Sequence, residues 1–323
     1  MCYILGYNVF KDKDNTMNMS AVISQMAVLF LILVIGFTAN KLRVLNSDSN
    51  KLLSKLVLNI ALPCTILNSV MNGQPTASGG DAALFMGIAL VMYAIFFAIA
   101  LPVPPLLRAP DKDRGITRFM LVFGNVGYMG FPVVETLFGP GAVFYVALVN
   151  MLFGLLCFSF GILMISGRGS KINPKLFLNP ALFASAAAIV IFALRVHTPG
   201  ILANTADIVG RLTTPCAMLI IGSTLAEIPF KEVFGAVRLY PFTIIKLLII
   251  PLLTWAVLRL FVTDTMMLRV LVVLAAMPSA TNATMMSFEY GGNEKLAAEG
   301  VFITTLFSIV TIPFLVYILF SGR

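Results

Sequence analysis

Charged residues are scarce in this sequence. Asp, Glu, Lys and Arg make up 11% of its 323 residues, whereas soluble globular proteins carry about 25%. Hydrophobic residues make up 59%, and the mean hydropathy is +0.97. A soluble domain of this length could not bury so much apolar surface, so lipid must replace water around most of the chain. The composition therefore excludes an ordinary soluble fold.

Residues that build metal sites and catalytic centres are also few. The four cysteines, Cys2, Cys64, Cys157 and Cys216, follow no zinc or disulfide spacing. His197 is the only histidine, and no HExxH motif or close pair of carboxylates lies in an apolar run. An intramembrane enzyme needs a nucleophile with its base, or a metal cluster. We therefore expect no enzyme, no bound metal and no cofactor.

Long apolar runs are what the sequence has instead. A helix needs about 20 mostly apolar residues to cross a bilayer, and ten segments meet that need, which predicts an all-α polytopic membrane protein. The expected spans are Ser20–Asn40, Lys51–Met71, Ala82–Leu106, Gly115–Phe138, Gly141–Ser166, Lys175–Val196, Ile201–Leu225, Leu239–Phe261, Thr265–Tyr290 and Ala297–Phe320. Residues 1–19 are expected to form a polar tail without a cleavable signal peptide, and translation from Met1, Met17 or Met19 is left open.

The positive charges indicate an orientation. The net charge is +8, and most of the 22 Lys and Arg residues fall in or beside the odd-numbered loops between spans. Cytoplasmic loops carry such an excess, so we expect those loops inside the cell and both termini outside, in the inner (plasma) membrane. No basic stripe interleaved with aromatic residues exists, so the lipid bilayer, and not nucleic acid, is the expected partner.

A single offset of 152 residues relates two pairs of landmarks. Pro63-Cys64 in the second span recurs as Pro215-Cys216 in the seventh, and Phe138-Gly139 recurs as Tyr290-Gly291. The same offset carries the first five spans onto the last five. Because five is an odd number, two such halves enter the membrane from opposite faces, as in the inverted repeats of many secondary transporters.

The repeat divides the chain into regions. We expect a first five-helix half over residues 20–166, a short cytoplasmic linker over 167–174, and a second half over 175–323, after the tail of residues 1–19.

Two of the spans should be broken. The fourth contains the run from Gly124 to Pro132, GNVGYMGFP, and the ninth contains MPSATNAT from Met277 to Thr284. Gly and Pro interrupt helices, and broken backbone is tolerated in a membrane only where protein or water satisfies it. Matched breaks in two halves indicate a transporter's binding site. The alternative is a pair of ordinary proline kinks.

Each break should expose the positive end of a half-helix, which attracts anions. Pro132 and Pro278 suit the first turn of these half-helices, because proline lacks the N–H group that would go unpaired there. A small carboxylate is therefore the expected substrate. The expected substrate-binding residues at the two breaks are Asn125, Gly127, Gly130, Pro132, Pro278, Ser279, Thr281 and Asn282.

Two further polar residues lie inside spans. Asn150 in the fifth span is a candidate for the site, because buried polar groups in membrane helices are costly and often functional. Lys246 in the eighth span either extends outward to the membrane surface or balances an anionic substrate or a carboxylate. Both interpretations of Lys246 stay open, and the second makes it a candidate site residue.

At this point the motifs resemble a known family. GNVGYMGFP followed by FGPGA, and AAMPSATNA followed by EYGGN, are similar to the auxin efflux carrier family, in its bacterial branch of malate and malonate permeases. Pro63 and the stretch TPCAMLIIGSTLA fit the same pattern. The resemblance implies ten helices in a scaffold part and a transport part, two crossing broken helices, and an elevator-type movement that carries organic anions. It also implies a polar residue near the crossing at Asn150.

Other functions remain as alternatives. A sodium-coupled organic-anion symporter of the bile-acid type shares this general architecture, and Asn and Thr oxygens at the breaks suit sodium. A passive channel or a receptor is not excluded by the sequence. Coupling to a proton, coupling to sodium and uncoupled transport are all left open, as are the direction of transport and a homodimeric assembly.

Overall fold

The computed structural model describes residues 19–71, 79–166, 180–194, 196, 198–227 and 236–320. Within these ranges the regular elements are helices, and the only β pairing is one isolated bridge. The α-helices are α1 (Met19–Lys41), α2 (Ser47–Leu56), α3 (Leu62–Met71), α4 (Gly79–Ala100), α5 (Val103–Leu106), α6 (Asp111–Val122), α7 (Phe131–Phe138), α8 (Val143–Leu156), α9 (Ile162–Ser166), α10 (Pro180–Ala193), α11 (Gly200–Gly210), α12 (Thr213–Glu227), α14 (Leu239–Ile244), α15 (Ile250–Leu258), α16 (Thr265–Ala275), α17 (Asn282–Tyr290) and α18 (Glu294–Phe320). Short π-helical or 3-10 turns join several of them: η1 (Val57–Ala61), η2 (Val126–Gly130), η3 (Pro140–Ala142), η4 (Cys157–Gly161) and η6 (Ile245–Ile249).

Many of these helices suit a membrane. Six are long and apolar enough to cross one, judged by length and composition: Ser47–Met71, Asp81–Leu106, Pro140–Ser166, Gly200–Glu227, Leu239–Leu258 and Glu294–Phe320. Shorter apolar helices lie in the first, fourth, sixth and ninth expected spans: Ala27–Lys41, Val126–Phe138, Phe183–Ala193 and Thr265–Ala275. The chain is a multi-pass helical membrane protein. Residues 1–18 of the expected tail, the expected linker 167–174, Cys2 and His197 lie outside the described residues.

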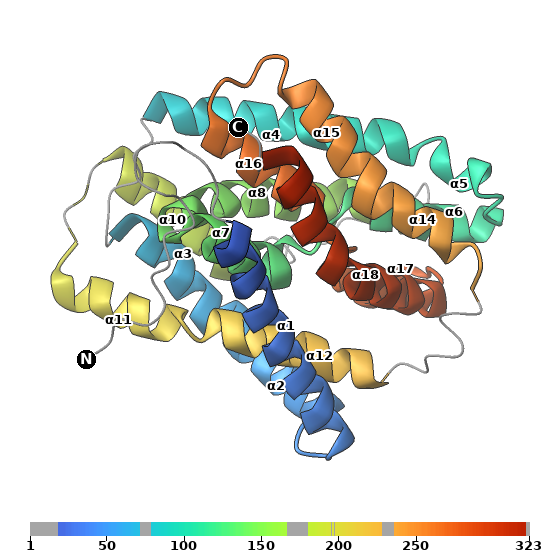
Figure 1. Ribbon diagram of the computed structural model, residues 1–323, viewed down its shortest axis with the longest axis horizontal. Coiled ribbons are helices and arrows are strands. Elements are labelled where there is room, and N and C mark those ends of the chain that lie inside the picture. Colours follow the sequence, from blue (N-terminus) through green and yellow to red (C-terminus); the bar gives the residue numbers. More distant parts are fainter. Residues whose placement is uncertain are drawn as a thin grey trace.

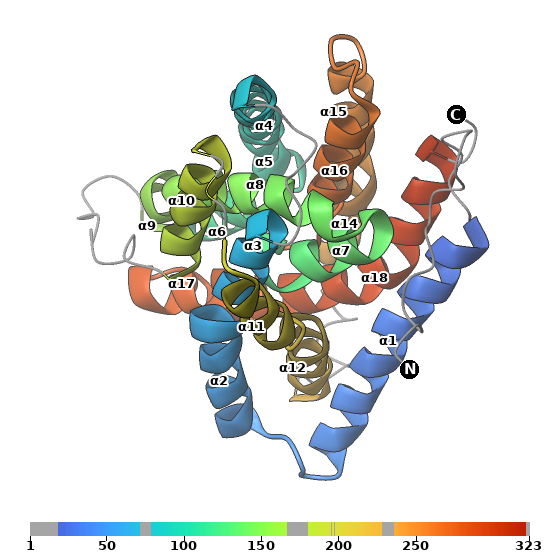
Figure 2. The same ribbon diagram turned by 90° about the vertical axis from the view of Figure 1, so that its left-hand side faces the viewer.

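Helices from the two ends of the sequence are interleaved. Figures 1 and 2 show α1 and α2 beside α12, α3 beside α11, and α4 beside α15. The α8 helix lies near the centre, among α3, α4, α7 and α10. Elements from the first and the second part of the chain therefore pack side by side.

A close approach holds α1 against α12. A Cβ atom added to Gly222 of α12 would collide with the Leu33 carbonyl of α1, so this contact requires a residue without a side chain. Toward the C-terminal end of α1, Asn40 Nδ2 donates to Ser223 Oγ over 3.0 Å, and Lys41 Nζ donates to the Ala226 carbonyl over 2.8 Å. The glycine permits backbone contact, and the polar pairs fix its register.

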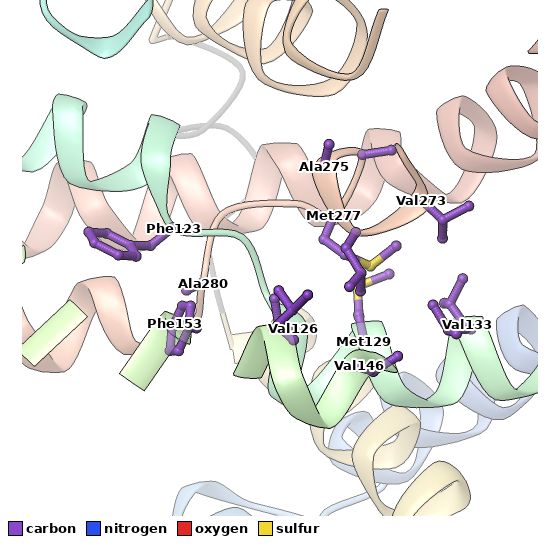
Figure 3. Packing of buried hydrophobic residues seen from close by; sticks show 14 of the residues in the cluster. Phe123, Val126, Met129, Val133, Val146, Phe153, Val273, Ala275, Met277 and Ala280 are labelled. Carbon is purple, nitrogen blue, oxygen red and sulfur yellow. The ribbon is translucent and has the colours of Figure 1, made fainter. Parts of the chain in front are cut away.

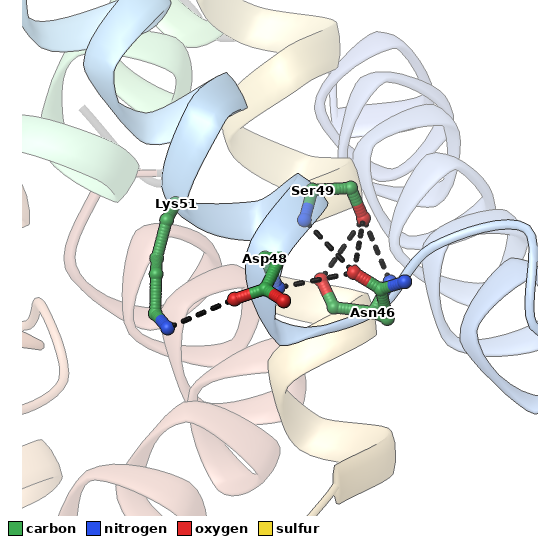
Figure 4. Close-up of polar contacts among 4 residues, drawn as sticks. All are labelled: Asn46, Asp48, Ser49 and Lys51. Carbon is green, nitrogen blue, oxygen red and sulfur yellow. Dashed lines mark hydrogen bonds and ion pairs between the residues drawn. The ribbon is translucent and has the colours of Figure 1, made fainter.

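The start of α2 is defined by its own sequence. Asn46 accepts hydrogen bonds from the backbone N–H groups of Asp48 and Ser49, and Ser49 Oγ accepts from the Asn46 N–H over 2.7 Å (Figure 4). Such reciprocal capping satisfies donors that the first helical turn leaves unpaired and is worth about 1 kcal/mol. Lys51 adds an exposed ion pair to Asp48.

Prolines explain three of the π-turns. Pro63, Pro132 and Pro251 each lie two residues beyond the end of a π-turn, after η1, η2 and η6 respectively. A proline inside a helix lacks the N–H donor, and its ring clashes with the carbonyl four residues earlier. Widening the preceding turn separates the two groups, so the helix continues with a bend.

The repeated glycine landmarks have the same local role. Gly139 ends α7 with φ of 84°, and Gly291 ends α17 with φ of 77°. The N–H of each donates to a carbonyl of the helix it ends, that of Glu135 and of Ser287 respectively. A positive φ favours glycine because it has no Cβ.

Candidate functional site

The fourth and ninth expected spans are both interrupted, and the interruptions touch. Residues 123–125 separate α6 from η2, and residues 276–281 separate α16 from α17. Gly124 and Ser279 form an isolated antiparallel bridge, in which the Asn125 N–H donates to the Pro278 carbonyl over 2.7 Å and the Ala280 N–H donates to the Phe123 carbonyl over 2.9 Å. The two breaks thus satisfy one another's backbone groups, as an apolar environment demands.

The crossing is tightly packed. A Cβ atom added to Gly124 would lie 3.3 Å from the Met277 Cβ, so the segments could not approach so closely with a larger residue. Buried side chains from both segments, among them Met129 and Met277, pack around the crossing with Val146 and Phe153 of α8 (Figure 3). The packing fixes the position of each half-helix end.

Side chains from the second part of the chain cap the end of α6. The last carbonyls of a helix lack partners within the helix. Ser279 Oγ donates to the Met120 carbonyl over 3.1 Å, and Lys246 Nζ donates to the Leu121 carbonyl over 2.9 Å. The Ser279 N–H in turn donates to Thr304 Oγ1 of α18. These contacts make Ser279 and Lys246 supports of the crossing.

The beginnings of the two following helices differ. Asn125 is the N-cap of η2, and its Oδ1 accepts from the Tyr128 N–H over 3.2 Å. Its Nδ2 has no hydrogen-bond partner in the described part of the chain, although the residue is only 3% exposed. Thr281, the N-cap of α17, makes no side-chain capping bond. A buried amide donor therefore lies near a helix start that no side chain caps.

A cavity of about 80 Å³ opens at this point. One water needs roughly 10–15 Å³ of such space, so the cavity has room for a few waters or part of a small ligand. Its lining consists of Leu58, Leu62, Gly124, Asn125, Val126, Gly127, Tyr128, Asn150, Phe153, Gly154, Phe158, Ala181, Ala280, Thr281 and Asn282. Within the described residues this lining contains no charged side chain, so its polar character comes from amides, hydroxyls and helix ends.

The expected site residues separate into two sets. Those that line the cavity are Asn125, Gly127, Asn150, Thr281 and Asn282. Those outside its lining are Gly130, Pro132, Pro278, Ser279 and Lys246. The outward extension proposed as one alternative for Lys246 is wrong, because the side chain is fully buried and bonded to a backbone carbonyl.

The two prolines differ in their outcome. Pro132 is the second residue of α7 and lies in its first turn as expected, although the π-turn η2 leads into that helix from Val126. The expected role of Pro278 is wrong, because it lies within the break, before α17 begins at Asn282. In the first segment Asn125 supplies the cap and so sets where the helix begins. In the second, the Pro278 carbonyl is held by the crossing, which keeps that residue in non-helical backbone.

Sequence reasoning missed the apolar walls. Tyr128, Phe153 and Phe158 line the cavity. Tyr128 lies inside the glycine-rich run, where its position gave a usable signal. Phe153 and Phe158 lie in apolar helices where one aromatic residue resembles another, so only packing identifies them. No group of three or more His, Cys, Asp or Glu side chains that could hold a metal occurs in the described ranges.

Comparisons with known proteins agree with a membrane transporter. The profile of a family described as "Membrane transport protein" matches residues 21–176 and 171–316. A Rhizobium meliloti protein named "Putative malonate transporter" is 28% identical over 249 residues, which cover 73% of this chain and 76% of that protein. An uncharacterized transporter of Methanocaldococcus jannaschii is 24% identical over 92% of this chain and 98% of its own length. An uncharacterized transporter of Escherichia coli is 20% identical over 92% of this chain and 97% of its own.

Proposed function

The chain belongs to the membrane transport protein family, which includes the auxin efflux carriers that its motifs resemble, and from this we propose that it carries small organic anions across the membrane. The substrates are mono- or dicarboxylates such as malate or malonate. The cavity at the crossing of the two broken helices is the binding site, and Asn125, Asn150, Thr281 and Asn282 contact the substrate.

One observation carries this proposal. The cavity has a buried amide donor, Asn125 Nδ2, that has no hydrogen-bond partner among the described residues, and the start of α17 beside it has no side-chain cap among them. Helix starts carry partial positive charge, and a carboxylate is an acceptor with two oxygens. No described acidic side chain lines the cavity to compete for these donors. An anion with the size of a carboxylate group therefore complements the site.

The relative named for malonate supports the substrate class. It matches most of this chain, but 28% identity is too distant to carry one substrate from protein to protein. Discrimination between a mono- and a dicarboxylate depends on a few side chains in the cavity wall, such as Tyr128 and Asn150. The proposal therefore extends to the class of small carboxylates.

The transport cycle that we propose moves one group of helices against another. Ten spans form two inverted five-helix halves, residues 20–166 and 175–323, joined by the linker 167–174, with both termini outside the cell. The six long helices and four shorter apolar ones, and the matched glycines Gly139 and Gly291, support this arrangement. The group containing the crossing moves against the group of α1–α3, α11 and α12 in an elevator-type cycle. A proton gradient, a sodium gradient or the substrate gradient alone drives it, and the three uptake conditions described next separate these alternatives.

Uptake by purified protein in liposomes tests the proposal. Radiolabelled malonate and malate are offered with a sodium gradient, with a proton gradient and with neither. Asn125→Ala should reduce uptake at least tenfold, because it removes a buried donor that the bound substrate would pair. Asn59→Ala is the matched control, because the Asn59 amide is exposed and bonds only to the Lys55 carbonyl of its own helix.

The outcomes are distinct. Accumulation above the external concentration identifies a coupled carrier. Downhill flux with counterflow of labelled substrate identifies an uncoupled carrier, whereas downhill flux without counterflow identifies a channel. Unchanged uptake in Asn125→Ala refutes the assignment of the cavity. Failure to take up any small carboxylate under all three conditions refutes the proposed function.

A further inference from the structure

Lys246 is the most completely buried charged side chain in the described part of the chain. Its exposed fraction is 0%, whereas Arg269, Asp113 and Glu299 retain 3%, 8% and 9%. It lies in η6, in the middle of an apolar helix. Lysine is almost never fully buried unless it is paired, so its contacts should explain why it is there.

Those contacts involve a helix end and an aromatic ring. Nζ donates to the Leu121 carbonyl in the last turn of α6, over 2.9 Å, and it lies 5.7 Å from the centre of the Phe96 ring. The negative end of a helix dipole and the face of an aromatic ring both attract a cation. The surroundings of Nζ therefore suit an ammonium group.

The position matters for the neighbouring cavity. Leu121 lies three residues before Gly124, and Gly124 is the first cavity-lining residue in the break that follows α6. The carbonyl end of α6 carries partial negative charge toward the crossing, and an anion there would be repelled. A buried cation at that carbonyl reverses the sign of the local field, and charges interact strongly where water is excluded.

We propose that Lys246 is a positioning residue that never contacts the substrate and that sets the charge preference of the crossing cavity by offsetting the negative end of α6. The inference rests on the proposed function, because it concerns how anions are preferred at that site. The effect should grow with substrate charge, because the electrostatic energy of a dicarboxylate in the same potential is about twice that of a monocarboxylate.

The other break supports a dedicated role. The last carbonyls of α16 are bonded by the N–H groups of Ala276 and Met277, which follow it directly. Ser279 Oγ, a neutral group, caps the Met120 carbonyl beside the Leu121 carbonyl. A neutral donor thus suffices at neighbouring carbonyls, so a buried cation at Leu121 has a consequence beyond hydrogen bonding.

Binding measurements with two ligands of different charge test the proposal. Malonate and monomethyl malonate are titrated into the full-length protein in nanodiscs at neutral pH, and Kd is measured for each. Lys246→Gln removes the charge but keeps an amide donor. Lys246→Arg keeps the charge. Ser279→Ala is the structural control, because it removes a neutral cap from the same helix end.

The expected result is a charge-dependent loss. Lys246→Gln should weaken the binding of monomethyl malonate on the order of tenfold, and the binding of malonate by a further factor of about ten. These factors follow from the Coulomb energy between the buried ammonium group and each negative charge of the ligand. Lys246→Arg should keep the wild-type ratio of the two Kd values. Ser279→Ala should change both Kd values by the same factor.

Equal losses for both ligands in Lys246→Gln would overturn the inference and leave the proposed function intact. If neither ligand binds wild type, the proposed function falls, and the inference falls with it. Should Lys246→Gln fail to yield folded protein by gel filtration, Lys246→Met is measured in its place, and a wild-type ratio of the two Kd values in that variant counts against the inference.

Discussion

The two breaks of the crossing differ in how their helix ends are satisfied. At the first, side chains from distant parts of the sequence, Ser279 and Lys246, cap the end of α6, and Asn125 caps the start of η2. At the second, the following N–H groups close the end of α16, and the start of α17 has no side-chain cap. The breaks form one bridge but are not equivalent.

This difference suggests that the first break supports the site and that the second supplies donors for the ligand. The first break is fixed by contacts that cross from one part of the chain to the other. We call this break and the side chains that cap it the frame of the site. The second leaves helix donors at the cavity, where Thr281 and Asn282 lie. A site that binds an anion needs both features, because donors must be held in place before the ligand arrives.

The largest expected effect comes from placing a negative charge at Asn125 in the first break. Asn125→Asp should reduce carboxylate uptake at least a hundredfold, because a carboxylate would then face the substrate in a buried site. Uptake into liposomes measures the loss. Asn46→Asp, at an exposed N-cap outside the expected spans, should retain most of the uptake, because Asp caps a helix as well as Asn does. Retained uptake in Asn125→Asp would contradict an anion site at this cavity.

The next effect concerns the close contact of the breaks. Gly124→Val should destabilise the protein by about 1–3 kcal/mol, because added methyl groups must displace Met277. Thermal unfolding in detergent measures the change. Gly87→Val in α4 is the control, since nothing lies within 4 Å of a Cβ added there. Equal stability of the two variants would mean that the crossing is looser than the contact indicates.

A smaller effect is expected for the cap that only the first break has. Ser279→Ala should cost about 1 kcal/mol, since hydrogen bonds between membrane helices contribute about 0.6 kcal/mol on average and at most about 1.7. Ser308→Ala should cost less, because Ser308 Oγ bonds only to the Thr305 carbonyl of its own helix. The two unfolding midpoints are compared directly, and the reverse order would remove Ser279 from the frame.

The smallest effect distinguishes the two helix starts. Asn125→Ala should lower stability by about 1 kcal/mol through loss of an N-cap, whereas Thr281→Ala should lie within about 0.5 kcal/mol of wild type, the range of substitutions that break no specific contact. Thr281 makes no capping bond that could be lost. A destabilised Thr281→Ala variant would show that the second start depends on its side chain after all.

Particular residues show how far the sequence could lead. Asn125, Thr281 and Asn282 were predicted at the site because glycine, proline and polar residues gather unusually in an apolar chain, and the structure places them around one cavity. Ser279 belongs to the same run, yet it faces the Met120 carbonyl. Composition marks a broken segment, but it does not tell which face of that segment meets the cavity.

Lys246 and the two prolines show the same limit. A lysine in an apolar span could lie at the surface, bind substrate or pair with a helix end, and only the position of α6 decides among these. Pro132 and Pro278 indicate irregular backbone, but the residue at which each helix begins depends on its cap and on the bridge between the breaks.

By itself, the sequence determined the membrane environment, the helical class and the two broken segments, because each follows from local composition: lipid requires long apolar helices, and glycine with proline interrupts them. Only the tertiary structure decided which polar groups meet. A crossing joins atoms that are more than a hundred residues apart, such as Lys246 Nζ and the Leu121 carbonyl, and such contacts depend on packing that no local pattern records.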